Sequence, residues 1–448
     1  MMRWTDATVR AALGLGAGDP AQRYAGVSTD TRKSEPGSLY VALVGERFDG
    51  HTFLAAARDA GATGAVVRIG TATVPGLTCY PVEDTLRAYG LLARFRRRAF
   101  RGPVVAITGT NGKTSTKEMM AAALGTKYWV HATRANLNNL VGVPQTILEA
   151  GDEIEAMVVE AGANLPGEIA RYREIIEPAL TIVTNVAAGH LEGFGSLEGV
   201  LAEKLALVKD VPVAVVGVDE PALAAGARLL AKRVVTAGLA GADVMPDEVH
   251  LEPNGRPSVS VDGVTFIVAQ LGSHQAGNAM LVWAAARELG LEPGAVARAL
   301  ESFTIPAGRG EVVEHGPLTI LNDCYNANPA SFRALIDVVR AIRGTRRLVF
   351  VAGTMLELGV DAATLHSEVA EALVALNPDL LAAVGAFVPA LGPWRAQLGD
   401  RLVVADDAPT MGRRLALQLR GEELVVLKGS RGVALERMIP DLVGRTEP

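Results

Sequence analysis

The sequence predicts an α/β protein of three domains, with a doubly wound, mostly parallel sheet in the central one. Short apolar runs typical of buried strands alternate with helix-like segments along most of the 448 residues, as in parallel sheets with helical crossovers. One of these runs leads directly into a glycine-rich loop that opens a helix. Because the alternation breaks and restarts twice, we expect a small N-terminal α/β domain at 1–101, a central P-loop domain at 102–305 and a Rossmann-like C-terminal α/β domain at 306–448.

The first domain is predicted from two strand-like runs, SLYVALVG and GAVVRIG, with the helix-like HTFLAAARDAGA between them. The apolar spacing of that helix predicts that it ends at Gly61. The domain closes with LLARFRRRAF, where arginines crowd residues 94–101. Since the whole chain carries a net charge of −6, we interpret this stretch as a solvated helix end and expect no nucleic acid partner.

The central and C-terminal segments each carry their own series of strands. PVVAITG, AMVVEAG, LTIVTN and VPVAVVG predict the central sheet, and alternating residues within 244–270 predict an antiparallel hairpin appended to it. A second open parallel sheet is predicted by LTILNDC, RLVFVAG, LLAAVG, RLVVADD and ELVVLKGS, each followed by helix-like sequence.

Composition narrows the class further. Apolar residues make up 49% of the chain and charged residues 21%, as in ordinary globular proteins. No apolar run approaches the about 18 residues that a membrane-spanning helix needs, and the first residues lack the apolar core of a signal peptide. The two cysteines, Cys79 and Cys324, suggest neither a disulfide framework nor a metal site by their spacing. We therefore expect a cytoplasmic protein without stable membrane insertion.

The loop in AITGTNGKTSTKEMM has the chemistry of a phosphate-binding site. A strand that turns into a helix points backbone N–H groups and the helix's positive end at an anion. Gly109 and Gly112 allow the tight turn, Lys113 would reach the β- and γ-phosphates, and the Thr114 hydroxyl would bind Mg²⁺. The strict pattern has a glycine where this chain has Ile107, so the loop is either a variant or a chance turn.

Three further residues follow strands of the central segment or lie on its helices. Glu160 closes the run AMVV, where a carboxylate could be a Mg²⁺ ligand or a surface acid that ends a strand. His190 follows LTIVTNVAAG and could be a structural histidine or a ligand. Lys204 lies among apolar residues of LAEKLAL, where a lysine usually extends to solvent.

Several of these stretches together resemble the Mur ligase family, the ATP-dependent amide-forming enzymes of peptidoglycan synthesis. The resemblance rests on GTNGKT, NLNNLVGVP, EAGANLPGEI, HLEGFGS, DCYNANP and MLELG, in that order, and on STDTRKSEPGSLYVALVGERFDGHTF near the start. It covers essentially the whole chain. It implies a monomer that uses ATP and two Mg²⁺ ions to join D-alanyl-D-alanine to UDP-N-acetylmuramoyl-tripeptide through an acyl phosphate.

The resemblance also implies roles for individual residues. ATP would be bound by Gly109, Thr110, Asn111, Gly112, Lys113, Thr114, Asn278, Arg309 and Asp323. One Mg²⁺ would be held by Thr114 and Glu160, and a second by His190 and a carbamylated Lys204; Lys113, Glu160, His190 and Lys204 would be catalytic. The UDP substrate would meet Ser28, Thr29, Asp30, Arg32, Arg47 and Asp49, further substrate contacts would come from Asn138 and Asn139, and the dipeptide would face Tyr325, Asn326 and Asn328.

Two other classes remain as alternatives. A related ligase, such as the diaminopimelate-adding enzyme or folylpolyglutamate synthase, would share the central domain and its chemistry. The element YNANP and the lack of an Asp-Asn-Pro-Arg element favour the dipeptide-adding members. A nucleotide-binding switch or motor-type ATPase would release phosphate without an amine acceptor, and it leaves the first and third domains unexplained. Whether residue three of the tripeptide is lysine or diaminopimelate stays open.

Overall fold

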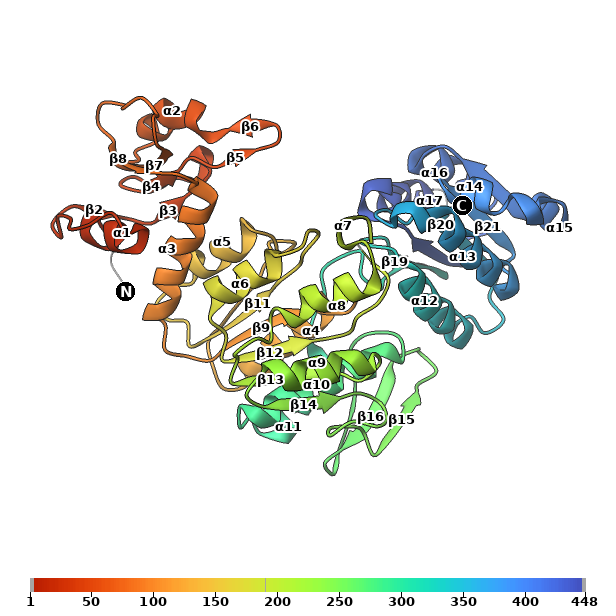
Figure 1. Cartoon of the computed structure of the whole chain (residues 1–448). Helices are drawn as coiled ribbons and strands as arrows, with labels where there is room; N and C mark the ends of the chain where they lie inside the picture. Colours follow the sequence, from red (N-terminus) through yellow and green to blue (C-terminus); the bar gives the residue numbers. More distant parts are fainter. Residues whose placement is uncertain (1–3, 190, 445–448) are drawn as a thin grey trace. The chain divides into compact units, whose positions relative to one another are not determined.

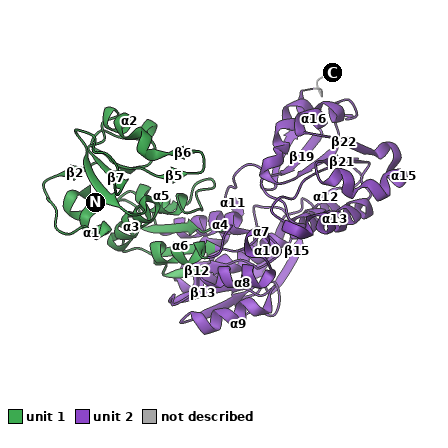
Figure 2. Cartoon of the chain, turned by 45° about the horizontal axis from the view of Figure 1, so that its top comes forward, with its two compact units in different colours: residues 1–107, 128–163, 167–181 green, residues 108–127, 164–166, 182–448 purple. Residues whose placement is uncertain are grey.

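Three larger sheets organise the chain in the computed structural model, which describes residues 4–189 and 191–444 (Figure 1). The α/β class is confirmed, and one of these sheets falls within each predicted domain range. The domain bounds themselves stay a prediction. By contacts the chain forms two compact units, residues 1–107, 128–163 and 167–181 in the first and 108–127, 164–166 and 182–448 in the second (Figure 2).

The N-terminal sheet has four parallel strands in the order β3-β4-β7-β8. Their bounds are Val27–Ser28, Leu39–Val41, Gly64–Arg68 and Thr78–Val82. Short pieces flank them: α1 (Asp6–Leu13), α2 (Leu54–Asp59), and the pairs β1 (Trp4–Thr5) with β2 (Arg23–Tyr24) and β5 (Val44–Gly45) with β6 (Phe48–Asp49). The predicted helix stop is confirmed, because α2 ends just before Gly61, whose φ is +97°.

The arginine-rich end of helix α3 (Thr85–Ala99) is not a solvated surface, so that expectation was wrong for most of it. Arg94 and Arg98 donate to the Glu177 carboxylate at 2.8 and 2.7 Å, and Arg97 donates to the carbonyls of Ile176 and Glu177 at 2.6 and 2.7 Å. Glu177 caps the C-terminal end of α6 (Glu168–Ile176), where unpaired carbonyls attract cations. Partial burial would raise the pKa of Glu177, but the bonds from Arg98 and Arg94 outweigh it and leave the pKa lowered. We call Arg94, Arg97 and Arg98 the arginine clamp.

The central sheet has six strands in the order β10-β11-β9-β12-β13-β14. Their bounds are Val130–Ala132, Ala156–Glu160, Val104–Thr108, Leu180–Val183, Val213–Gly217 and Val234–Ala237. The pairs β10–β11, β11–β9 and β13–β14 are parallel. The helices of this region are α4 (Lys113–Gly125), α5 (Gly142–Glu149), α6, α7 (Leu191–Phe194), α8 (Leu197–Leu205), α9 (Pro221–Leu230), α10 (His274–Glu288) and α11 (Pro293–Ser302). Every residue of β9 is buried, which fits its inner position and its continuous apolar sequence.

The predicted hairpin within 244–270 is confirmed and gains a third strand. β15 (Glu248–Leu251), β16 (Pro257–Val261) and β17 (Val264–Ile267) form an antiparallel sheet. The tight turn between β16 and β17 is Asp262-Gly263, with φ of +55° and +75°, the backbone that an Asp-Gly pair favours.

The C-terminal sheet has the order β18-β19-β23-β20-β21-β22. Its strands are Glu311–His315, Leu318–Asp323, Leu424–Lys428, Leu348–Gly353, Leu380–Val384 and Leu402–Ala405 in that order. β18 is antiparallel to β19 and was not predicted, because its residues alternate between exposed and half-buried instead of forming an apolar run. One face packs against α12 (Pro329–Ile342), α13 (Ala362–Leu376) and α14 (Phe387–Ala390), and the other against α16 (Ala408–Ala416) and α17 (Ile439–Val443).

The last strand in sequence, β23, lies between β19 and β20 and is parallel to both. The segments that follow these three strands therefore share one edge of the sheet. The helices after β19 and β20 cover one face, and the chain after β23 covers the other. In open parallel sheets, ligands bind at such a reversal, beside the carboxyl ends of the strands. We call this place the β19–β23–β20 edge; it carries Asp323, Tyr325, Asn326, Lys428, Ser430 and Arg431.

Candidate active site

The glycine-rich loop joins β9 to α4 and is held in shape by its own glycines. Gly109 and Gly112 have φ of +145° and +78°, a backbone that side chains rarely tolerate. A Cβ at Gly109 would collide with the Thr184 hydroxyl, and one at Gly112 would lie 2.6 Å from the Asn278 Oδ1 atom. Gly112 is also the residue before the first turn of α4, so the helix's free N–H groups open onto the loop.

Lys113 and Thr114 occupy the first turn of α4. The Lys113 ammonium donates to the carbonyls of Gly109 and Thr110 at 2.8 and 2.9 Å, which keeps its charge over the loop. Thr114 is buried, as are Ser115 and Thr116 after it. A cation and a helix N-terminus at one loop make an environment that favours bound phosphate.

Two residues at the end of β12 support the loop and were missed at the sequence level. The Thr184 hydroxyl donates to the Asn111 carbonyl at 2.6 Å. The Asn185 side chain accepts from the Asn111 N–H at 3.0 Å and donates to its carbonyl at 3.2 Å, and the Asn185 carbonyl accepts from the Thr110 N–H at 3.1 Å. The signal that could have found them is the polar pair Thr-Asn directly after a buried parallel strand.

Asn278 lies on α10, which packs against α4, and it is buried. Its amide donates to the Gln275 side chain at 2.8 Å, and its oxygen faces Gly112 closely. Asn278 is therefore packed against the phosphate loop, and its contact with ATP stays a prediction.

Glu160 ends β11 and is only 1% exposed. Its register partner is Ile107 on β9, one residue before the strand ends and the loop begins. The Asn138 amide donates to the Glu160 carboxylate at 2.8 Å, and the Glu160 N–H donates to the Thr133 hydroxyl at 2.9 Å. Asn138 thus orients the predicted metal ligand. The exposed Asn139 side chain accepts from the Gly142 N–H, at the start of α5, at 2.8 Å.

Lys204 does not extend to solvent as an ordinary lysine would. It lies on α8, is 2% exposed, and has its ammonium 5.5 Å from the centre of the Phe194 ring. His190, the other predicted ligand of the second metal ion, lies outside the described residues. Within residues 4–189 and 191–444, no group of three or more His, Cys, Asp or Glu side chains could hold a metal ion.

The residues predicted to meet the UDP substrate fall into two turns of the first unit. Arg32 donates twice to the Asp30 carboxylate at 2.9 and 2.8 Å, and these bonds lower the pKa of Asp30 to about 2. Ser28 donates to the Asp30 carbonyl, which tightens the same turn. In the second turn Asp49 accepts from the His51 backbone and ring at 2.9 and 2.6 Å, and bonds from His51 lower the pKa of Asp49. Thr29 lies in the first turn, and Arg47 is exposed between β5 and β6.

At the β19–β23–β20 edge, Asp323 meets a lysine that the sequence did not single out. The Lys428 ammonium donates to Asp323 at 2.6 Å and to the Asn326 carbonyl at 2.9 Å, and this side chain is 2% exposed. A buried charge needs such partners. The signal for Lys428 was the charged residue that ends the apolar run ELVVLKGS.

Tyr325 lies within cation–π distance of two arginines. The Arg309 guanidinium carbon is 3.8 Å from the ring centre, and that of Arg431 is 5.4 Å away. The Tyr325 N–H donates to the Gly308 carbonyl at 3.0 Å, which holds the segment before Arg309 against the loop after β19. Arg431 was not predicted.

The side chains of Asn326 and Asn328, the two asparagines predicted at this edge, also accept hydrogen bonds from backbone N–H groups. Asn326 accepts from the Ala327 N–H at 2.8 Å. Asn328 caps α12 by accepting from the Ser331 N–H at 2.9 Å, and its amide donates to the Asn111 side chain at 2.7 Å. Asn328 thereby links α12 to the phosphate loop.

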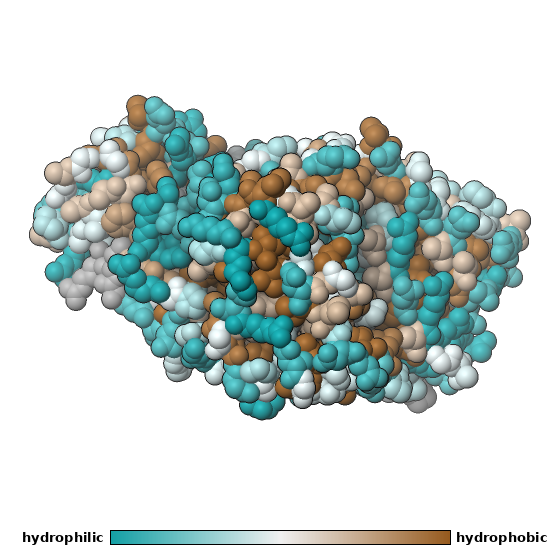
Figure 3. All heavy atoms as spheres, turned by 60° about the horizontal axis from the view of Figure 1, so that its bottom comes forward, coloured by the Kyte–Doolittle hydropathy of each residue, from teal (hydrophilic) through white to brown (hydrophobic). Residues whose placement is uncertain are grey.

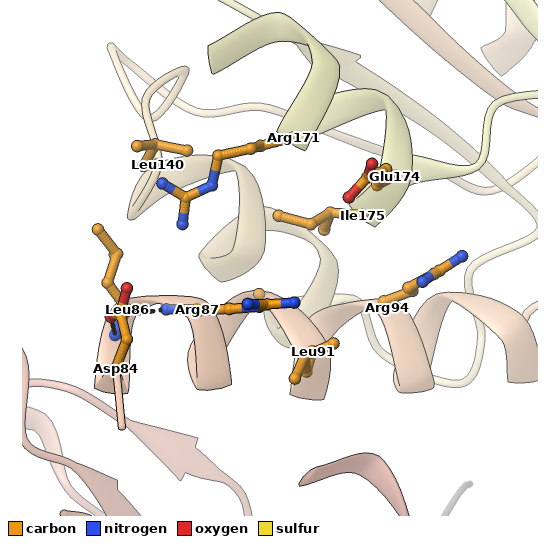
Figure 4. A pocket seen from close by; sticks show the side chains of 10 residues that line it. Asp84, Leu86, Arg87, Leu91, Arg94, Leu140, Arg171, Glu174 and Ile175 are labelled. Atoms are coloured by element: carbon orange, nitrogen blue, oxygen red, sulfur yellow. Dashed lines mark hydrogen bonds between the residues drawn. The ribbon is translucent and has the colours of Figure 1, made fainter. Parts of the chain in front are cut away.

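A cavity of about 440 Å³ lies between α3 and α6 in the first unit (Figure 4). Arg87, Arg94 and Arg171 line it together with Leu91 and Ile175. None of the predicted site residues lines this cavity.

The face drawn in Figure 3 mixes hydrophilic and hydrophobic side chains and has no continuous apolar belt. Among the residues that the structure describes, no helix combines the length and apolar character needed to cross a bilayer.

Comparisons with known proteins place this architecture in a family. The model of the Mur ligase middle domain matches residues 107–286, and that of the Mur ligase, glutamate ligase domain matches residues 308–431. The chain belongs to the Mur ligase family. Its relatives include the UDP-N-acetylmuramoyl-tripeptide–D-alanyl-D-alanine ligases of Bacillus subtilis, 32% identical over 93% of both chains, and of Escherichia coli, 34% identical over 92% of both.

Solved structures agree with this membership. The chain is similar to MurF from Acinetobacter baumannii, with 28% identity, a TM-score of 0.89 and coverage of 99% of both chains. It is also similar to the MurF ligase from Thermotoga maritima in complex with ADP, with 27% identity, a TM-score of 0.82 and coverage of 94% of this chain and 97% of that one. The glycine-rich loop lies at the start of the matched Mur ligase middle domain.

Proposed function

We propose that this chain is an ATP-dependent, ADP-forming ligase that joins D-alanyl-D-alanine to UDP-N-acetylmuramoyl-tripeptide in peptidoglycan synthesis. The observation that carries the proposal is the phosphate loop, built from Gly109 to Thr114 at the end of an inner parallel strand. The names of the relatives, which align over more than nine-tenths of the chain, supply the two substrates. The ADP bound to the Thermotoga maritima relative supports ATP as the nucleotide.

The chemistry follows from what such a loop can hold. A carboxylate oxygen at the end of the tripeptide attacks the γ-phosphorus, the bond to the β-phosphate oxygen breaks, and ADP leaves. The neutral amine of the dipeptide then attacks the acyl carbon, inorganic phosphate leaves, and the nitrogen loses a proton to form the amide. Holding the reacting groups in line is worth roughly 7–11 kcal/mol of the barrier. Lys113 supplies positive charge to the phosphates, as in phosphoryl transfer generally.

The ATP site uses residues that the loop already brings together. The N–H groups at the start of α4 and the Lys113 ammonium would meet the β- and γ-phosphates. Asn278, packed against Gly112, would lie on the adenine side, and Arg309 and Asp323 would serve the nucleotide from the C-terminal domain. Thr184 and Asn185 would keep the loop open for phosphate.

We propose that this chain holds two Mg²⁺ ions. Buried Thr114 and buried Glu160, the latter oriented by Asn138, offer the hydroxyl and carboxylate oxygens that Mg²⁺ prefers. The second ion would be held by His190 and Lys204; carbamylation of Lys204 by CO₂ would turn a buried cation into an oxygen ligand. When bound, the ions neutralise charge on the transferring phosphoryl group.

The remaining assignments follow the same lines. Ser28, Thr29, Asp30, Arg32, Arg47 and Asp49 would bind the UDP substrate, and Tyr325, Asn326 and Asn328 would face the dipeptide. A monomer in the cytoplasm, acting on water-soluble substrates, is the state we propose for the working enzyme.

The test is phosphate release from ATP with UDP-N-acetylmuramoyl-tripeptide, with and without D-alanyl-D-alanine, and mass spectrometry of the product. We expect release to require the dipeptide and to match pentapeptide formation mole for mole. Lysine- and diaminopimelate-containing tripeptides should be compared as donors. Offering diaminopimelate to UDP-N-acetylmuramoyl-dipeptide tests the rival ligase; turnover there and none with D-alanyl-D-alanine would overturn the proposal. Release that needs no amine would indicate a simple ATPase.

A further inference from the structure

The β19–β23–β20 edge gathers three cationic side chains around one tyrosine and one aspartate. Lys428 ends β23, Arg431 follows it three residues later, and Arg309 approaches from the segment before β18. Cations that share an edge repel one another unless anions neutralise them. Each of these three cationic side chains therefore needs an anion nearby, either in the protein or in a ligand.

Lys428 is already neutralised. Its ammonium contacts Asp323 at 2.6 Å and the Asn326 carbonyl at 2.9 Å, and it is almost fully buried. Its role is to fix the loop after β19, because it ties the carboxylate at the end of that strand to a carbonyl three residues on. It has little capacity left for a ligand.

Arg431 is in the opposite situation. It is exposed, and in the described part of the chain no acidic side chain lies within ion-pair distance of it. Its one specific contact is the Tyr325 ring, 5.4 Å from the guanidinium carbon. Arg309 lacks an acidic partner in the same ranges, but it lies closer to the ring, at 3.8 Å, and the nucleotide accounts for its charge under the proposed function.

The backbone that carries Arg431 is held firmly even though its side chain is not. The Ser430 N–H donates to the Thr354 carbonyl at 3.0 Å, and the Ser430 hydroxyl accepts from the Leu356 N–H at 3.0 Å. At Gly429 a Cβ would come within 3.2 Å of the Gly353 Cα, so the segments after β23 and β20 touch through backbone. A guanidinium on a fixed base can bind a planar anion with two parallel hydrogen bonds at little entropic cost.

We propose that Arg431 binds the terminal carboxylate of the incoming dipeptide and so selects an amino component that ends in a free carboxylate. This proposal rests on the proposed function. The amine of the dipeptide must be uncharged when it attacks. The C-terminal carboxylate is then the one charged group by which the protein can recognise the dipeptide. A two-residue chain spans at most about 7 Å, so Arg431 also sets how far from this edge the amide bond forms. The Tyr325 ring, which lies beside the Arg431 guanidinium, would pack against the methyl side chains of the dipeptide.

The test removes the charge from each partner in turn. D-alanyl-D-alanine is compared with its C-terminal amide as acceptor, in the wild-type protein and in Arg431→Gln and Arg431→Lys. For the wild type we expect kcat/KM to fall roughly 10- to 100-fold with the amide, the range for losing a charge-assisted contact. Arg431→Gln should show a similar fall with D-alanyl-D-alanine, through KM, and no further fall with the amide. Arg431→Lys should lie between the two.

Controls separate recognition from damage to the fold. Arg437→Gln removes an exposed arginine six residues on and should leave both acceptors unchanged. The KM values for ATP and for the UDP substrate should stay within about twofold in Arg431→Gln. Equal use of both acceptors by the wild type, or equal losses with both in Arg431→Gln, would overturn the proposal. A rise in the KM for ATP in place of that for the dipeptide would assign Arg431 to the nucleotide instead. If the wild type turns over neither acceptor, the proposed function itself fails.

Discussion

The phosphate loop and the β19–β23–β20 edge both lie at the carboxyl ends of parallel strands, yet they are built in different ways. In the loop, six consecutive residues carry the chemistry, and side chains from β12 and α10 only hold that backbone in place. At the edge, the working side chains come from segments that follow different strands, more than 100 residues apart in the chain. The loop offers backbone N–H groups, whereas the edge offers charged side chains.

This difference indicates which substitutions each region can accept without losing its ligand. A loop that binds through its backbone depends on conformation, so its sensitive positions are glycines and the residues that fix them. An edge that binds through side chains depends on charge balance, so its sensitive positions are the ion pair of buried Lys428 and the two arginines beside Tyr325. The loop is suited to an anion that backbone N–H groups can hold, and the edge to a ligand that is recognised by its charge.

The largest effect is expected at the loop, from Lys113→Ala. The Lys113 ammonium donates to two carbonyls of the loop. Its removal should lower phosphate release by at least about 10²- to 10³-fold, because the loop would lose the side-chain cation that it supplies to the transition state. Thermal unfolding should be nearly unchanged. Lys232→Ala, at an exposed lysine elsewhere in the same unit, serves as the matched control. Near-normal phosphate release by Lys113→Ala would show that the loop is not the phosphate site, and would contradict its comparison with the β19–β23–β20 edge.

An intermediate effect is expected at the edge, from Asp323→Asn. Losing the partner of buried Lys428 should lower the free energy of unfolding of the C-terminal sheet by about 3 kcal/mol, measured by urea denaturation. Asp337→Asn breaks an exposed pair with Arg340 and should change stability little. The double variant Asp323→Asn, Lys428→Met should recover part of the loss. If it recovers none, the charge of Lys428 is not what makes Asp323 necessary.

The smallest expected effect is on the pH dependence of stability, and it comes from Cys324, the residue after Asp323. Burial, and then the nearby Glu436 carboxylate, raise the pKa of its thiol to about 12. Because the folded pKa is raised, this contribution to stability is complete below the unfolded pKa of about 8.5 and is lost as pH rises toward 12. The wild type should therefore lose stability faster than Cys324→Ser between those values, by at most about 1.4 kcal/mol per pH unit.

Parallel pH titrations of unfolding check this, with Cys79→Ser, at a half-buried thiol, as control. Identical pH profiles for the wild type and Cys324→Ser would mean that the thiol is open to water, and that the edge is less well packed than its contacts indicate.

Sequence reasoning succeeded where chemistry is contiguous. The loop, its helix and the buried strand before it could be predicted because all three lie within one short stretch. Thr184 and Asn185 could not, since their value depends on β12 lying beside β9, which spacing alone does not reveal. Lys428 and Arg431 could not be predicted for the same reason. β23 is the last strand in sequence, but in the sheet it lies between β19 and β20.

The arginine-rich end of α3 shows the opposite error. Taken alone, a run of arginines in a helix is best explained by solvent, and the acidic partner that overrides this lies about 80 residues further on. Glu177 adopts φ of +40° at the end of α6, a conformation that no local pattern announces. The contacts of Asn138 with Glu160 and of Asn139 with the start of α5 were not predicted either, and the substrate contacts expected of these two residues stay a prediction.

The arginine clamp also bears on how the chain is made. The first compact unit is discontinuous and needs residues up to Thr181 to be complete. A ribosome adds about 5–20 residues per second, so Arg94 leaves it roughly 4–16 s before Glu177 does. During that interval Arg94 and Arg98 lack the carboxylate that they contact in the folded chain. The clamp at the end of α3 therefore forms only after the chain has been made as far as α6.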